Sequence, residues 1–147
     1  MKIYMIIKNF VYSLLGKKTI GARALVLDND KILLIKHTYM EGWCTIGGGV
    51  EEGEAPQQTI LRELLEEVGV VAKSVKLFSV YHSQAEKRDD YVVFYICTDF
   101  LEKNYICVSE IKEKKWFKLK ELPSDISPAT LRRIKEYYGE TEISDKW

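Results

Sequence analysis

Three glutamates at helical spacing are the strongest chemical feature of this sequence. Residues 55–68 have the apolar periodicity of a helix, and the apolar side chains fall on one face. Glu63, Glu66 and Glu67 fall on the opposite face at i, i+3 and i+4, where like charges repel. Carboxylate oxygens at this spacing suit Mg²⁺ or Mn²⁺, with phosphate oxygens completing the coordination shell. The alternative is an ordinary solvated helix face.

The segment before this helix favours the metal site. Gly47, Gly48 and Gly49 allow the backbone to approach a ligand closely, and a carbonyl exposed there can be a further metal ligand. Residues 48–70 contain six glutamates and one arginine, a formal charge of −5 in a chain whose net charge is zero. The acidic character is therefore concentrated around the candidate site.

The order of residues from Gly48 to Val70 follows one fixed pattern, G-x5-E-x7-R-E-U-x-E-E-x-G-U, where U is apolar. This is the Nudix box, and the sequence resembles the Nudix hydrolase family over residues 20–138. The resemblance implies an α+β fold, an α/β/α sandwich with a mixed central sheet. It also implies hydrolysis of a nucleoside diphosphate linked to another group X, by water attack at phosphorus with Mg²⁺, or alternatively Mn²⁺.

The resemblance assigns a role to each box position. Glu63 and Glu67 match the principal metal ligands, and Glu66 matches an additional ligand or a carboxylate that positions water. Gly48 matches the residue whose carbonyl can reach the metal.

Two further box residues, Glu54 and Arg62, match a structural ion pair that fixes the loop to the helix. One departure lies just upstream, where many relatives carry Trp-x-Leu-Pro-Gly-Gly. Here Thr45 and Ile46 replace the leucine and proline, which leaves the loop less restrained in φ. We expect this change to tune the site without abolishing it, because every acidic position is present.

The general base is either one of the three helix glutamates or Glu110, which precedes a predicted strand. A plain surface position is the alternative for Glu110, and Glu113 competes with it for this role. His37 and His82 are expected to be surface or hydrogen-bonded histidines rather than catalysts.

Three residues outside the box are candidates for substrate binding. Arg23 on the first predicted strand could reach phosphate, or it could be a surface arginine. Trp43 could stack on a base, although a tryptophan that anchors the core or loop is the commoner case. Arg88, with Lys87, lies in the polar segment 82–90, which is either a substrate-facing loop or a solvated hairpin tip.

The remaining pattern predicts a hairpin, a helix, several strands and a final helix. The residues 42–50 are a loop or short strand, and 141–147 are a loosely held polar tail. The predicted strands are 20–27, 31–37, 71–80, 90–100, 105–108 and 115–119, and the final helix runs from Ser127 to Tyr138.

The chain of 147 residues is expected to be a single domain, 1–147, with a core of its own. Neutral net charge gives no reason to expect a nucleic-acid coat protein. The three cysteines predict free buried thiols and a cytoplasmic location. Residues 1–16 predict an amphipathic helix packed on the domain, with contact to a membrane surface or a second copy as the less favoured alternative.

Two functions compete. One is an active pyrophosphohydrolase acting on a small nucleotide; the other is a catalytically silent nucleotide-binding or sensor module. The first is favoured because no box glutamate is missing. The sequence does not distinguish among nucleoside triphosphates, nucleotide sugars and ADP-ribose as substrates. It is also compatible with a homodimer.

Overall fold

A mixed six-stranded sheet forms the centre of the computed structural model, which describes residues 2–85, 89–104 and 109–147. The strand order is β4-β5-β1-β2-β6, and the short β3 pairs with β1. The pair β1–β5 is parallel and the other pairs are antiparallel. The strands are β1 (Lys18–Asp28), β2 (Lys31–His37), β3 (Ile46–Gly49), β4 (Val70–Ser83), β5 (Asp89–Glu102) and β6 (Ile111–Lys118).

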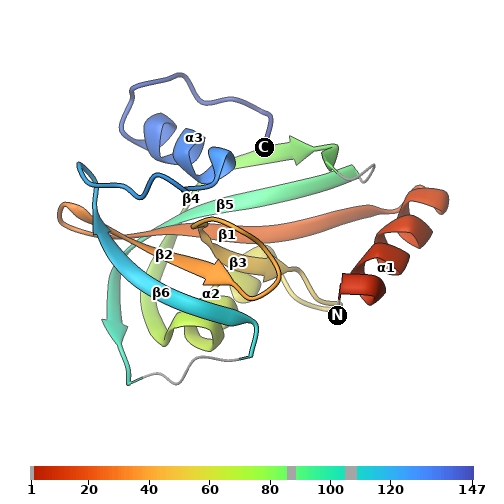
Figure 1. Ribbon diagram of the computed structural model, residues 1–147, viewed down its shortest axis with the longest axis horizontal. Helices are drawn as coiled ribbons and strands as arrows, with labels where there is room; N and C mark the ends of the chain where they lie inside the picture. The colour runs from red at the N-terminus through yellow and green to blue at the C-terminus, as the bar shows by residue number, and fades with distance from the viewer. Residues whose placement is uncertain (1, 86–88, 105–108) are drawn as a thin grey trace.

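One helix covers each face of this sheet. Figure 1 shows α3 (Pro128–Tyr137) above the sheet and α2 (Pro56–Val68) below it. The predicted α+β sandwich with a mixed central sheet is therefore confirmed.

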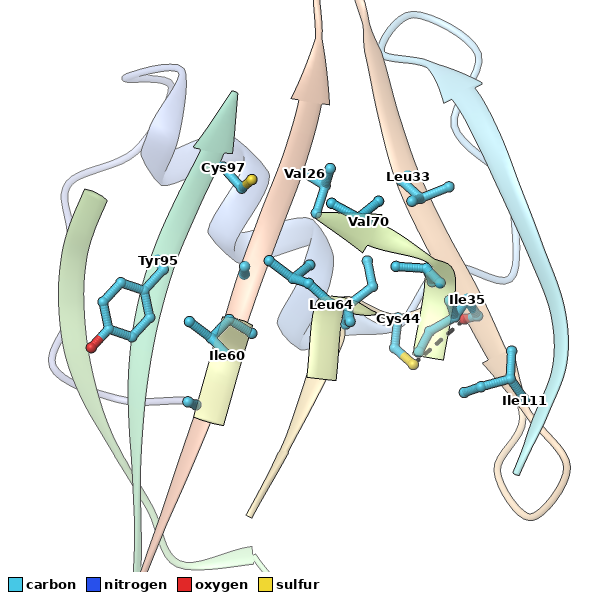
Figure 2. Close-up of a cluster of buried hydrophobic side chains, with 14 residues drawn as sticks. Val26, Leu33, Ile35, Cys44, Ile60, Leu64, Val70, Tyr95, Cys97 and Ile111 are labelled. Atoms are coloured by element: carbon cyan, nitrogen blue, oxygen red, sulfur yellow. Dashed lines mark hydrogen bonds between the residues drawn. The ribbon is translucent and has the colours of Figure 1, made fainter. Parts of the chain in front are cut away.

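The two faces of the sheet have separate cores because successive side chains of a strand alternate between them. On the α2 side, Ala22, Ala24 and Val26 of β1 pack with Ile60 and Leu64 of the helix. Figure 2 shows Ile60 and Leu64 among the strand side chains of this cluster.

On the α3 side, the intervening residues of β1 contribute instead. Leu25 and Leu27 belong to a second buried cluster with Phe94 of β5 and Ile134 of α3. Each helix therefore packs on its own hydrophobic core, and the two cores lie on opposite faces of the sheet.

Local signals set the ends of the helix that carries the box. Pro56 occupies the first turn, and the Ala55 N–H donates to the Gln58 side chain at 2.8 Å. The helix ends at Gly69, whose φ of 69° is in the left-handed region that favours glycine. The predicted helix 55–68 thus differs from α2 by one residue, and the predicted hairpin 20–37 turns at Asn29 as β1–β2.

The prediction of a loosely held tail at the end of the chain is wrong. Residues 141–147 were expected to be loosely held, but Trp147 packs against Tyr81 and Phe94, with ring centroids 5.8 Å from each. The Trp147 N–H donates to the His82 carbonyl at 2.9 Å, and the His82 N–H donates to the Asp145 carbonyl at 2.7 Å. Aromatic packing and these hydrogen bonds fix the segment beside β4.

The prediction that the N-terminal helix packs on the domain is also wrong. The helix forms as α1 (Lys2–Leu14), but its apolar side chains are exposed rather than packed on the domain. Figure 1 shows α1 at the side of the molecule, beyond the start of β1. Across the described part of the chain, no helix has both the length and the apolar character needed to cross a membrane.

Two of the cysteines are free and buried as predicted, Cys44 and Cys97, and burial raises the pKa of each thiol to about 11. The predicted strand 105–108, which includes Cys107, lies outside the described residues.

Candidate active site

Glu67 is the most buried carboxylate of the acidic helix. Its side chain accepts a hydrogen bond from the Gly47 N–H at 3.0 Å, and the residue is 7% exposed. Burial raises the pKa of Glu67 to about 7, with the nearby Glu63 charge acting in the same direction. The protein therefore holds this carboxylate where its negative charge is unfavourable unless a cation compensates it.

Glu63 lies directly over the backbone of Gly48. A Cβ placed on Gly48 would overlap the Glu63 carboxylate, with 2.8 Å to its Cδ atom. The absence of a side chain at residue 48 is thus what lets the carboxylate reach the β3 backbone. Burial raises the pKa of Glu63 as well, although the Arg62 guanidinium opposes the shift.

Arg62 connects the loop to the helix through Glu54. Its Nε and Nη2 donate to the two carboxylate oxygens of Glu54 at 2.7 Å and 3.0 Å, a bidentate pair. Thr59 adds a hydrogen bond to Glu54 at 2.7 Å. These bonds lower the pKa of Glu54 to about 2, and the contacts are those expected of the predicted structural ion pair.

The helix glutamates face a cavity of about 300 Å³. Glu110 reaches the same cavity from the segment before β6, and its carbonyl accepts from the Thr38 N–H at 2.9 Å. Glu113, the competing candidate, lies exposed on β6 and is not among the lining residues. The lining residues are Glu63, Glu66, Glu67, Ser109 and Glu110.

The cavity fits a divalent cation by its donor chemistry. Carboxylate and carbonyl oxygens are the ligands that Mg²⁺ prefers, and the glycine at residue 48 leaves the backbone accessible. As the side chains stand, however, no three His, Cys, Asp or Glu residues within 2–85, 89–104 and 109–147 gather closely enough to hold a metal. Arg62 Nη1 donates to Glu63 at 2.8 Å and to Glu66 at 3.3 Å, so these carboxylates would have to turn from the guanidinium to bind an ion.

Arg23 lies outside the carboxylate cavity. Since Ala22 and Ala24 face α2, the Arg23 side chain projects toward α3, where Nη1 donates to the Thr45 carbonyl at 3.1 Å. Its guanidinium carbon lies 5.9 Å from the Trp147 ring centroid. Its positive charge nevertheless opposes the rise in the pKa of Glu67, so Arg23 is close enough to act electrostatically on the site.

The other two candidates for substrate binding have different outcomes. Trp43 is 5% exposed, and its ring packs edge-on against Phe117 at 4.7 Å. Its backbone hydrogen-bonds to Asp125 and Ser127, and Lys36 Nζ lies 4.9 Å from its ring centroid, a placement that fits the loop-anchoring alternative. Arg88 and Lys87 lie outside the described residues.

The sequence interpretation missed Tyr39, which follows the end of β2 and contacts His37. His37 is 4% exposed, and its Nδ1 lacks a hydrogen-bond partner in the described part of the chain. Its ring stacks on Tyr39 at 4.9 Å, and burial lowers the pKa of His37 while raising that of Tyr39. The charges of Glu110 and Glu67 both add to the rise in the pKa of Tyr39, so this phenol lies within electrostatic range of two glutamates that line the cavity. His82, by contrast, pairs with Asp89 away from it.

Comparisons with known proteins agree with this geometry. The model of the NUDIX domain matches residues 17–138, so the chain belongs to the NUDIX family. A MutT NUDIX hydrolase from Burkholderia pseudomallei has the same fold, with a TM-score of 0.73, 23% identity and coverage of 81% of this chain and 97% of that one. The NUDIX domain of Shewanella oneidensis NrtR, solved with ADP ribose, has a TM-score of 0.68, 18% identity and coverage of 84% and 88%.

Among curated proteins, the chain is similar to diphosphoinositol polyphosphate phosphohydrolase 2 of Rattus norvegicus. The identity is 33% over 93 residues, which is 63% of this chain and 52% of the relative. The chain thus spans about half the length of this relative.

Proposed function

We propose that this protein is a Mg²⁺-dependent pyrophosphohydrolase that cleaves a nucleoside diphosphate linked to a group X. The observation that carries the proposal is the gathering of four glutamates around one cavity, where Glu67 is buried and Glu63 is half-buried. Three of the four lie on a helix whose box is complete. Such a surplus of negative charge is unfavourable in the protein alone and suits a cation that binds phosphate.

Four residues would hold the ion: Gly48 through its carbonyl, and Glu63, Glu66 and Glu67 through their carboxylates. A divalent ion held there would neutralise phosphate charge and would make the attacking water more acidic. The reaction forms a bond from the water oxygen to phosphorus and breaks the phosphoric anhydride, giving two phosphorylated products. A helix glutamate or Glu110 accepts the proton of the water.

Other residues of the chain hold these groups in position. The bidentate pair of Arg62 with Glu54 keeps the loop against α2, and the Gly47 N–H orients the Glu67 carboxylate. Correct placement matters because a small displacement of a catalytic group costs much of its effect. Arg23 lies within electrostatic range of Glu67 and would add positive charge with which a substrate phosphate could pair.

Hydrolysis assays with a panel of substrates would identify the group X. The panel includes nucleoside triphosphates, nucleotide sugars and ADP-ribose, each with Mg²⁺, with Mn²⁺ or with EDTA. Diphosphoinositol polyphosphates belong in it as a second substrate class, because the curated relative is named for acting on them.

We expect phosphate products from at least one compound, with activity that EDTA abolishes. The variant Glu63→Gln should lose most of the activity, and Glu113→Gln, on an exposed glutamate outside the cavity, should keep it. Hydrolytic activity that is unchanged by EDTA would contradict the metal mechanism. Tight binding of a nucleotide without turnover would instead favour the silent binding module.

A further inference from the structure

Helix α1 presents an apolar surface to solvent. The residues Ile3, Ile7, Phe10 and Leu14 share one stripe at i, i+4, i+7 and i+11. Three of them, Ile3, Phe10 and Leu14, are 73%, 63% and 70% exposed, whereas Met5 on another side of the helix is 37% exposed. The apolar stripe therefore faces away from the rest of the molecule.

The domain does not cover this stripe. Neither buried cluster contains a residue of α1, as far as the described residues go. Gly16, with φ of 59°, lies between the helix and β1, and Figure 1 shows the helix beside the sheet rather than on either face. A contiguous apolar surface of this kind on a globular protein marks a contact with something outside the fold.

The charge around α1 indicates what that contact is. The first acidic residue of the chain is Asp28, and the 27 residues before it contain four lysines and one arginine. The chain as a whole is neutral, so this basic character is segregated at one end. A basic segment beside an apolar helix face complements an anionic lipid surface.

We propose that α1 binds peripherally to an anionic membrane surface, with the stripe of Ile3, Ile7, Phe10 and Leu14 buried among the lipids. Thirteen helical residues extend about 20 Å, short of the roughly 30 Å hydrocarbon core, so the helix lies along the surface. Pairing with a second copy is less favourable, because two copies of α1 would bring like-charged segments together.

The test is sedimentation of the full chain with vesicles. One set contains phosphatidylcholine alone and the other contains about 30% phosphatidylserine, the anionic lipid that attracts basic segments. The double variant Phe10→Asp and Leu14→Asp removes the apolar stripe. Leu101→Asp is the control on another surface, since Leu101 is an exposed leucine on β5.

We expect the chain to sediment with the anionic vesicles and the double variant to bind at least about tenfold more weakly. The control should bind like the unchanged chain, and neutralising Lys2, Lys8 and Lys17 to Gln should weaken binding to the anionic set. Failure of the unchanged chain to bind, or equal binding by the double variant, would overturn the proposal.

Light scattering without vesicles addresses the competing partner. A dimer that the double variant dissociates, together with no vesicle binding, would assign α1 to a second copy and overturn the membrane proposal. A monomer that binds anionic vesicles would support it.

Discussion

Each face of the sheet carries an arginine beside glutamates, and the two arrangements differ in charge balance. On α3, Arg133 pairs with one carboxylate, Glu136, at 2.9 Å, and both side chains are almost fully buried. Tyr81 and the Ser144 N–H complete the bonds to Glu136 at 2.6 Å and 3.1 Å. On α2, by contrast, Arg62 contacts several carboxylates and the group faces a cavity.

The difference separates a structural network from a binding site. A buried pair whose charges balance and whose carboxylate is hydrogen-bonded on both oxygens holds the fold together, although Arg133 Nε has no hydrogen-bond partner among the described residues. A cluster with a surplus of one charge is incomplete without a partner of the opposite charge. The comparison predicts that changes on α2 reduce function and changes on α3 reduce stability.

The largest expected effect is on the α2 side. Glu67→Gln keeps the size of the side chain and an acceptor for the Gly47 N–H, but removes the charge. We expect kcat/KM to fall about 10³-fold, because a metal ligand supplies several kcal/mol of transition-state stabilisation. Urea unfolding should change little. A variant that keeps its activity would break the distinction between the two faces.

The reverse outcome is expected on the α3 side. Glu136→Gln leaves the buried Arg133 without its countercharge and should lower the free energy of unfolding by about 3 kcal/mol. Activity of the folded fraction should be preserved. Glu140→Gln, on an exposed residue just beyond α3, is the control, and equal urea midpoints for the two variants would contradict the structural role.

A smaller effect is expected at the glycines of β3. Gly48→Ala places a methyl group against the Glu63 carboxylate, whereas Gly49→Ala meets nothing within 4 Å. We expect Gly48→Ala to raise the Mg²⁺ concentration needed for half-maximal activity about tenfold, as misplaced ligands do. Gly49→Ala should respond to Mg²⁺ like the unchanged protein; similar responses of both variants would argue against a metal contact at residue 48.

The smallest effect concerns pH. Since the pKa of Glu54 is lowered to about 2 from an ordinary value near 4.5, its ion pair stabilises the fold above pH ~4.5 and is lost as the pH falls toward 2. Glu54→Gln should therefore be less stable than the unchanged protein at pH 7, and the gap should narrow by pH 3. Thermal unfolding of both proteins measures this, with exposed Glu52→Gln in the same loop as control. A gap independent of pH would point to lost packing rather than lost charge.

The sequence predicted what depends on neighbours along the chain. Gly48, Glu54 and the helix glutamates lie within one loop and helix, so fixed spacing was enough to group them. The hairpin of β1 and β2 and the limits of α2 likewise follow from turn residues and periodicity.

Features that depend on distant contacts could not be predicted. The tail is polar in sequence, yet Trp147 packs against Tyr81 of β4 and Phe94 of β5. The choice between Glu110 and Glu113 depends on how β6 pairs with β2, where the register shifts beside His37. Helical periodicity in α1 showed an apolar stripe, but only the tertiary structure shows which way that stripe faces.

The parallel pairing of β1 with β5 has a consequence for folding. It joins Lys18 through Val26 to Asp89 through Cys97, and α2 lies in the chain between these strands. Closing so long a loop is entropically costly and slows folding, whereas the β1–β2 hairpin forms from local contacts. During synthesis, therefore, we expect α2 to emerge well before β5, which contributes Tyr95 and Cys97 to the core beneath this helix. We expect the proposed cation site to be among the last parts of the molecule to assemble.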